Sequence, residues 1–210
     1  MRFYLSSYKI GNATDQLKTL LPAANRKVAY ISNALDWSSD LERRKRNAQS
    51  DIEQLQRLNL GLEIERLDLR EYFGRQPELK SKVLQFGTIW VCGGNTFVLR
   101  QAMKLSGFDN VLRELYASGA DMLYGGYSAG ICILAPTLQG VDIVDTPSVK
   151  PYGDIETLWD GLGILNYSIV PHFESNHPES EAAGRSAAYL KEQNIPFRTL
   201  RDGEVIVIED

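Results

Sequence analysis

Residues 122–134 read Met-Leu-Tyr-Gly-Gly-Tyr-Ser-Ala-Gly-Ile-Cys-Ile-Leu, an apolar run, a glycine-rich turn and a second apolar run. Within them, Gly126-Tyr127-Ser128-Ala129-Gly130 fits G-x-S-x-G, in which small flanking residues permit a sharp turn that lifts the serine hydroxyl clear of a sheet. A plain tight turn is the alternative interpretation. The flanking apolar runs favour a strand, a turn and a helix, with Ser128 as a nucleophile.

Apolar runs and amphipathic segments alternate along the whole chain. We expect strands at 3–7, 27–32, 64–67, 88–92, 122–124 and 167–170, and helices at 15–21, 41–60, 78–85, 96–104, 111–118, 131–134 and 179–193. A closing hairpin is expected from 197–200 and 205–208 around Asp202-Gly203. This alternation predicts one α/β domain over 1–210, with a mostly parallel sheet covered by helices on both faces. Ligands of such sheets bind beyond the carboxyl ends of the strands.

Composition excludes several classes of protein. The 210 residues suit a single domain, and 43% apolar with 24% charged residues is typical of a globular protein. A net charge of −4 gives no basis for nucleic-acid binding. No apolar stretch reaches the roughly 20 residues that span a bilayer. Residues 1–5 predict a strand, not a signal peptide, and Cys92 and Cys132 lie in apolar runs, so we expect free thiols and a cytoplasmic location.

A serine hydroxyl needs a base to accept its proton, and histidine is best matched to that role near neutral pH. The chain contains two histidines. His172 follows the strand expected at 167–170, which places it at the same sheet edge as Ser128. His177 lies five residues further on in a polar segment. We therefore expect His172 to be the base and His177 to be a supporting or surface residue.

A third group, an aspartate or glutamate, normally orients such a base. The long irregular segment 139–162 offers several candidates, and the residues alone do not choose among them. They are Asp142, Asp145, Asp154, Glu156 and Asp160.

A second glycine-rich turn, Gly93-Gly94-Asn95-Thr96-Phe97, follows the strand expected at 88–92. Backbone N–H groups at such a turn can hold an anion. The N–H groups of Gly94 and Ala129 could together form an oxyanion hole. The alternative is an ordinary strand-to-helix turn capped by Asn95 or Thr96. No lysine follows the glycines, so this is not a nucleotide phosphate loop.

These motifs occur in an order that resembles the peptidase E (aspartyl dipeptidase) and cyanophycinase family of serine peptidases. The motifs are residues 91–97, residues 126–130 and Pro171-His172-Phe173. The resemblance implies a class I glutamine amidotransferase-like (flavodoxin-like) three-layer fold. It also implies Ser128 as nucleophile, His172 as base and Gly94 with Ala129 as oxyanion donors. Asp142 is our first choice for the third group, with Asp145, Asp154 or Glu156 as alternatives.

The resemblance further implies an arginine, on the helix after the catalytic histidine, that binds the side chain of an N-terminal aspartate. Arg185 lies near that place after a shift of one residue, and we expect Arg185 and Asn95 to contact substrate. We expect a serine peptidase that acts on short peptides. We expect it to need no cofactor or metal and to be a monomer or a homodimer. An esterase or amidase, or an inactive binding or regulatory module, are the alternatives.

Overall fold

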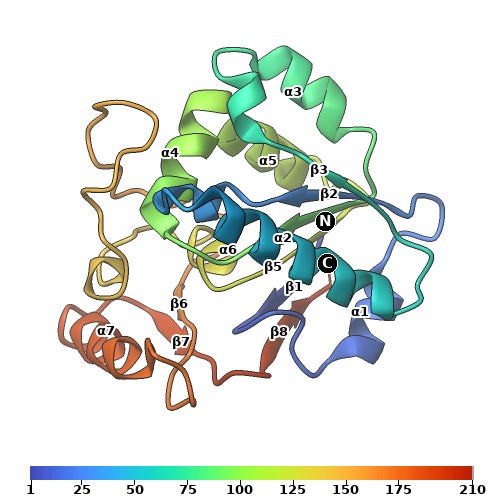
Figure 1. Ribbon diagram of the computed structural model, residues 1–210. Helices are drawn as coiled ribbons and strands as arrows, with labels where there is room; N and C mark the ends of the chain where they lie inside the picture. Colours follow the sequence, from blue (N-terminus) through green and yellow to red (C-terminus); the bar gives the residue numbers. More distant parts are fainter. Residues whose placement is uncertain (210) are drawn as a thin grey trace.

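Strands and helices alternate along residues 1–209, the part of the chain that the computed structural model describes (Figure 1). The strands are β1 (Arg2–Ser6), β2 (Lys27–Ile31), β3 (Glu63–Arg66), β4 (Thr88–Val91), β5 (Leu123–Tyr127), β6 (Ser168–Val170), β7 (Phe197–Thr199) and β8 (Val205–Ile208). The α-helices are α1 (Thr14–Leu20), α2 (Leu41–Arg57), α3 (Gln76–Val83), α4 (Thr96–Ser106), α5 (Phe108–Ala117), α6 (Ala129–Cys132) and α7 (Ser180–Glu192). Three 3-10 helices are η1 (Asn33–Trp37), η2 (Leu69–Tyr72) and η3 (Val141–Ile143).

The main sheet has the strand order β3-β2-β4-β5-β1-β8. Its pairs are parallel except for β8, which runs antiparallel to β1 at the edge. The mostly parallel α/β architecture expected from the sequence is therefore confirmed. The expected hairpin is wrong: β7 pairs in parallel with β6 in a separate two-stranded sheet, and β8 joins the main sheet. The segment around Asp202 thus connects two sheets.

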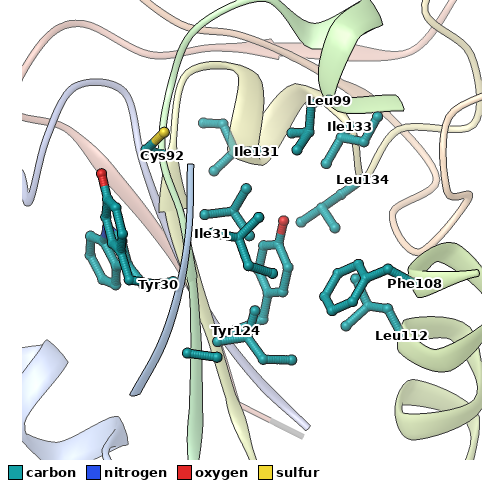
Figure 2. Packing of buried hydrophobic residues seen from close by; sticks show 14 of the residues in the cluster. Tyr30, Ile31, Cys92, Leu99, Phe108, Leu112, Tyr124, Ile131, Ile133 and Leu134 are labelled. Atoms are coloured by element: carbon teal, nitrogen blue, oxygen red, sulfur yellow. The ribbon is translucent and has the colours of Figure 1, made fainter. Parts of the chain in front are cut away.

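Alternate side chains of the central strands enter the two faces of the sheet, because side chains of a strand alternate in direction. Figure 2 shows Tyr30 on one side of β2 and Ile31 on the other, where Ile31 faces Leu134 and the α5 residues Phe108 and Leu112. These side chains are buried. Burial of large apolar side chains on both faces holds the central strands between two layers of helices.

Helix α2 covers the Tyr30 face of the sheet with a narrow apolar stripe. Ile52 and Leu55 of this stripe are buried. Beside them lies a buried carboxylate, Asp51, which accepts hydrogen bonds from the hydroxyls of Tyr30 at 2.8 Å and Tyr127 at 2.6 Å. Lys9 Nζ lies 2.6 Å from the other Asp51 oxygen. Since buried charges require such partners, this contact ties α2 to Tyr127, the residue before Ser128.

The segment between α6 and β6 is irregular, as its composition predicts, apart from η3 and one bridge between Thr137 and Asp160. It is anchored by Arg100, a buried residue of α4. The guanidinium of Arg100 donates to Asp109 at 3.0 Å and to Asp160 at 2.7 Å. The segment is therefore held over the carboxyl ends of β4 and β5, where the two glycine-rich turns lie.

Two further expectations concern the cysteines and membranes. Cys92 and Cys132 are both buried free thiols. Along residues 1–209, no helix has the combination of length and apolar character that crossing a bilayer requires.

Candidate active site

The turn after β5 holds Ser128 in a backbone conformation that is rare for a residue with a side chain. Its φ is 50° and its ψ is −118°. A Cβ at Gly126 would lie 2.4 Å from the carbonyl oxygen of Val91, and one at Gly130 would lie 2.3 Å from the same oxygen. Glycine is therefore required on both sides of Ser128, because β4 passes too close for a side chain. A strained residue presented in this way, between a strand and a helix, is typical of an exposed nucleophile.

The turn after β4 lies against this elbow. A Cβ at Gly93 would lie 3.0 Å from Ser128 Cβ. Gly94 has φ +145°, and a Cβ there would lie 2.3 Å from the carbonyl oxygen of Ala34 in η1. Within the described residues, the N–H groups of Gly94 and Ala129 donate to no protein acceptor. Both are thus free to donate to an oxyanion beside Ser128.

His172 comes directly after β6 and Pro171, in the left-handed region with φ 61°. Its Nδ1 lies 2.7 Å from Asp202 Oδ1. An ionised carboxylate can only accept, so Nδ1–H donates to Asp202 and Nε2 keeps a lone pair. His172 and Ser128 line the same cavity of 360 Å³. No hydrogen bond joins their side chains among residues 1–209, and such bonds are often long before substrate binds.

Two serines fix the His172–Asp202 pair. Ser7, at the end of β1, accepts the N–H of His172 at 2.9 Å and donates its hydroxyl to Asp202 Oδ1 at 3.0 Å. Ser175 accepts the N–H of Asp202 at 2.8 Å. The orientation of the imidazole therefore depends on three separate segments of the chain.

His177 covers one face of the His172 ring. The two rings stack with centroids 3.7 Å apart and planes inclined by 9°, and Tyr8 meets both edge-on. His177 Nδ1 accepts the N–H of Glu179 at 3.2 Å, so this ring is held in place by its own loop. Burial lowers the pKa of His172, opposed by its hydrogen bond to Asp202 and assisted by His177. Burial also lowers the pKa of His177. The lowered pKa of each ring favours its neutral form.

The structure corrects our choice of Asp142 as the partner of His172. Asp142 is exposed, and its carboxylate accepts the N–H of Gly140 at 3.0 Å in its own turn. The alternatives in the same segment do not reach Nδ1 either. Asp145 bonds Thr96, Asp154 pairs with Lys150, Asp160 pairs with Arg100, and Glu156 is exposed. The physical reason is that the connection from β7 to β8 places Asp202 against the imidazole, so that its carboxylate is the one bonded to Nδ1.

Of the two predicted substrate contacts, Asn95 lines the cavity that contains Ser128 and Arg185 does not. Asn95 is buried and caps α4: its Oδ1 accepts the N–H of Val98 at 2.9 Å, and its Nδ2 donates to the carbonyl of Thr146 at 3.0 Å. Its amide thus also holds the loop that contains Thr146. The side chain of Arg185 is 57% exposed and pairs with Glu181 at 2.7 Å. It does not line the cavity that contains Ser128.

The cavity beside Ser128 is polar. Lys9, Arg43, Asp145 and Glu179 supply its charged lining. In the described part of the chain, His172, His177 and Asp202 also offer possible metal-ligand atoms within 4.8 Å of one another. We assign no metal there, because the two rings are stacked in parallel and one nitrogen of each is already in a hydrogen bond.

Comparison with known proteins places the chain in a family. The family model for peptidase family S51 matches residues 6–210. The chain belongs to peptidase family S51. An uncharacterized peptidase of Listeria monocytogenes is 35% identical to it over 140 residues, which cover 62% of this chain and 64% of that protein. An uncharacterized peptidase of Pasteurella multocida is 31% identical over 153 residues, covering 73% of this chain and 70% of its own length. The match thus spans about two thirds of these relatives.

Two solved structures share the fold. A candidate peptidase E from Listeria monocytogenes superposes with a TM-score of 0.70 at 23% identity, covering 100% of this chain and 98% of that one. A peptidase from an acI-B1 Actinobacterium superposes with a TM-score of 0.70 at 16% identity, covering 99% and 83%. At these identities the likeness shows the fold alone.

Several residues at the site were missed from the sequence. They are Ser7, Tyr8 and Asp202. A usable signal existed for Ser7 and Tyr8, because they directly follow the first expected strand and so lie at the same sheet edge as Ser128. Asp202 also follows a strand, but the expected hairpin turn hid that position.

Proposed function

We propose that this S51 protein is a serine peptidase that hydrolyses short peptides. The single observation that carries the proposal is the arrangement at the sheet edge. A strained, half-buried Ser128 shares a cavity with His172, whose Nδ1 bonds a carboxylate and whose Nε2 is left as an acceptor.

The residues support a two-step acyl transfer. His172 Nε2 accepts the proton of Ser128 as Oγ forms a bond to the peptide carbonyl carbon, and Asp202 stabilises the resulting imidazolium. The N–H groups of Gly94 and Ala129 hold the oxyanion. The C–N bond then breaks, and the leaving amine takes the proton from His172. Water attacks the acyl-enzyme by the reverse route and releases Ser128.

A preference for N-terminal aspartate needs a cation that faces the substrate beside Ser128. Arg185 is turned to the surface. Lys9 and Arg43 line the cavity. The ammonium of Lys9 already contacts the buried Asp51, whereas the guanidinium of Arg43 lies over the ring of Trp37 and forms no ion pair with a carboxylate of residues 1–209. We therefore expect any preference for Asp-X dipeptides over dipeptides with a neutral first residue to depend on Arg43 and to be lost in Arg43→Met. An advantage for Asp-X that persists in Arg43→Met and is lost in Lys9→Met would assign that role to Lys9 instead.

The test combines labelling with turnover. A fluorophosphonate should label the wild type at Ser128 and should not label Ser128→Ala, while Ser106→Ala, a buried serine of α4, serves as a control that retains labelling. A panel of dipeptides, N-acetylated peptides and simple esters then defines the substrate class. Hydrolysis of esters alone would favour an esterase. Absence of labelling and turnover would favour a binding or regulatory module and refute the proposal.

A further inference from the structure

Tyr127, the residue before Ser128, has no role in the two-step acyl transfer, yet its hydroxyl is firmly bound. Tyr127 is only 6% exposed and borders the cavity of the nucleophile. Its hydroxyl donates to Asp51 Oδ2 at 2.6 Å. Since Asp51 belongs to α2, this hydrogen bond connects the turn that carries Ser128 to a helix on one face of the sheet.

Asp51 is a fixed point for this hydrogen bond. It is 4% exposed. Its Oδ2 also accepts the hydroxyl of Tyr30 at 2.8 Å, and Lys9 Nζ lies 2.6 Å from Oδ1. Burial raises the pKa of both tyrosines, so both hydroxyls stay protonated and can donate. A buried carboxylate with three partners has little freedom to move, so it can hold Tyr127 in one place.

The ring of Tyr127 lies against the second glycine-rich turn. A Cβ at Gly93, at the start of that turn, would lie 2.7 Å from Tyr127 Cε2 and 3.0 Å from Ser128 Cβ. Tyr8 meets the Tyr127 ring edge-on with centroids 6.0 Å apart, and Tyr8 also meets His172. A shift of the Tyr127 ring would therefore disturb the surroundings of the nucleophile, the oxyanion donors and the base together.

Ser128 needs such support because its backbone is strained. Its φ of 50° lies in the left-handed region, and a strained residue keeps its conformation only where the surrounding structure holds it. After Ser128, the buried Tyr124 donates its hydroxyl to the carbonyl of Gly130 at 2.6 Å. Before Ser128, the corresponding contact is that of Tyr127 with Asp51. Buried tyrosine hydroxyls thus fix the turn on both sides of the nucleophile.

We propose that Tyr127 is a positioning residue whose hydroxyl, bound by Asp51, keeps Ser128 in its strained conformation beside the base and the oxyanion donors. The inference rests on the proposed peptidase function and deepens it, because Tyr127 then sets the rate of acyl transfer through the placement of Ser128 and not through substrate binding. Without the hydroxyl the turn can relax, and Ser128 Oγ leaves the geometry in which His172 accepts its proton.

Tyr30 provides a matched comparison. Its hydroxyl donates to the same oxygen of Asp51, and Tyr30 is 0% exposed, but it lies in β2 and borders a different cavity, of 190 Å³. Removal of either hydroxyl deprives Asp51 of one donor, so both changes should cost similar stability. Only Tyr127 is joined directly to Ser128. A purely structural role of Asp51 therefore predicts equal effects of the two changes, whereas positioning predicts a loss of catalysis from one of them.

The test compares Tyr127→Phe with Tyr30→Phe. In Tyr127→Phe, kcat on the best substrate of the dipeptide panel should fall by about 10- to 100-fold with little change in KM, the size of effect expected for a misplacement of about 1 Å. The second-order rate constant for labelling of Ser128 by a fluorophosphonate should fall with it, because this reagent needs no peptide-binding contacts. Tyr30→Phe should keep both wild-type rates. Urea unfolding verifies that the two variants are folded and similarly stable.

A third variant reaches the same hydrogen bond from α2. Asp51→Asn should lower both rates, and adding Tyr127→Phe to it should lower them by less than Tyr127→Phe does alone, because the two changes disrupt one contact. Independent losses that multiply would overturn the inference. Wild-type rates in Tyr127→Phe, an equal loss in Tyr30→Phe, or a rise in KM alone would each overturn it too, while leaving the proposed function intact. Failure of the fluorophosphonate to label wild-type Ser128 would refute the proposed function, and the inference with it.

Discussion

Replacing Asp145 by asparagine should stabilise the protein at neutral and alkaline pH. Burial raises the pKa of this carboxyl from its ordinary 3.8 to about 6, opposed by hydrogen bonds from Thr96 and assisted by Glu179. The folded state therefore holds the proton more tightly than the unfolded chain does. Asparagine keeps an oxygen that can accept the N–H of Thr96. It removes the charge of a half-buried carboxylate that folding has to desolvate.

The size of the expected stabilisation follows from the pKa shift of Asp145. Below pH 3.8 both states are protonated and Asp145 has no effect on folding. Between pH 3.8 and about 6 the unfolded chain ionises first, so the wild type loses stability as the pH rises. A shift of about 2 pH units corresponds to about 3 kcal/mol. Above pH 6 we thus expect Asp145→Asn to gain about 3 kcal/mol, or roughly 6–12 °C in melting temperature for a chain of this size.

Urea unfolding of both proteins at several pH values between 4 and 8 measures the difference. The difference in free energy of unfolding between Asp145→Asn and the wild type should be near zero at pH 4 and should reach its full size above pH 6. Asp154→Asn is the control, because Asp154 is exposed and pairs with Lys150, and it should show no comparable gain. A variant that is no more stable than wild type at pH 8, or a gap that does not change with pH, would refute the reasoning.

Three further predictions concern the catalytic groups. Asp202→Asn should lower kcat on a dipeptide by up to about 10⁴-fold because the wrong tautomer of the base is favoured, whereas Asp142→Asn should keep nearly wild-type rates in the same assay. The acid limb of the pH–rate profile should lie below pH 6.5, since the pKa of His172 is lowered. Replacing His177 by alanine would expose the His172 ring to water, so the acid limb of His177→Ala should lie at higher pH than that of the wild type. In His177→Phe an aromatic ring still covers His172, so the limb should not move. Equal pH–rate profiles for the wild type and His177→Ala would contradict the stacking role. Gly94→Ala should reduce kcat by about 10²–10³-fold, because its Cβ would meet a carbonyl oxygen at 2.3 Å, and an unchanged kcat would argue against an oxyanion role.

The fold and the turn that carries Ser128 could be predicted from the sequence because their signals are local. The strand, turn and helix around Ser128 are continuous in sequence, and the glycines that the turn needs stand beside it. The strand before His172 likewise places the imidazole at the sheet edge. Each of these predictions required only that parallel strands end at a common edge.

The partner of His172 could not be read because it depends on strand pairing. The residues of β7 and β8, with a turn sequence between them, favour a hairpin, and nothing local shows that β7 pairs with β6 instead. The correct pairing moves Asp202 from a hairpin tip to within 2.7 Å of His172. Arg185 illustrates a second limit. One step along α7 turns the direction by about 100°, so Ser186 lines a cavity of 30 Å³ that Ser128 also lines, while Arg185 faces solvent.

The two sheets divide the catalytic groups between them. Ser128 follows β5 of the larger sheet, whereas His172 and Asp202 follow β6 and β7 of the smaller one. The imidazole of His172 and the carboxylate of Asp202 therefore belong to the same sheet. Ser7, which follows β1 of the larger sheet, forms hydrogen bonds with both residues. Ser7 therefore holds the smaller sheet against the larger one beside the base, and the packing of the two sheets sets the distance that a proton crosses between Ser128 and His172.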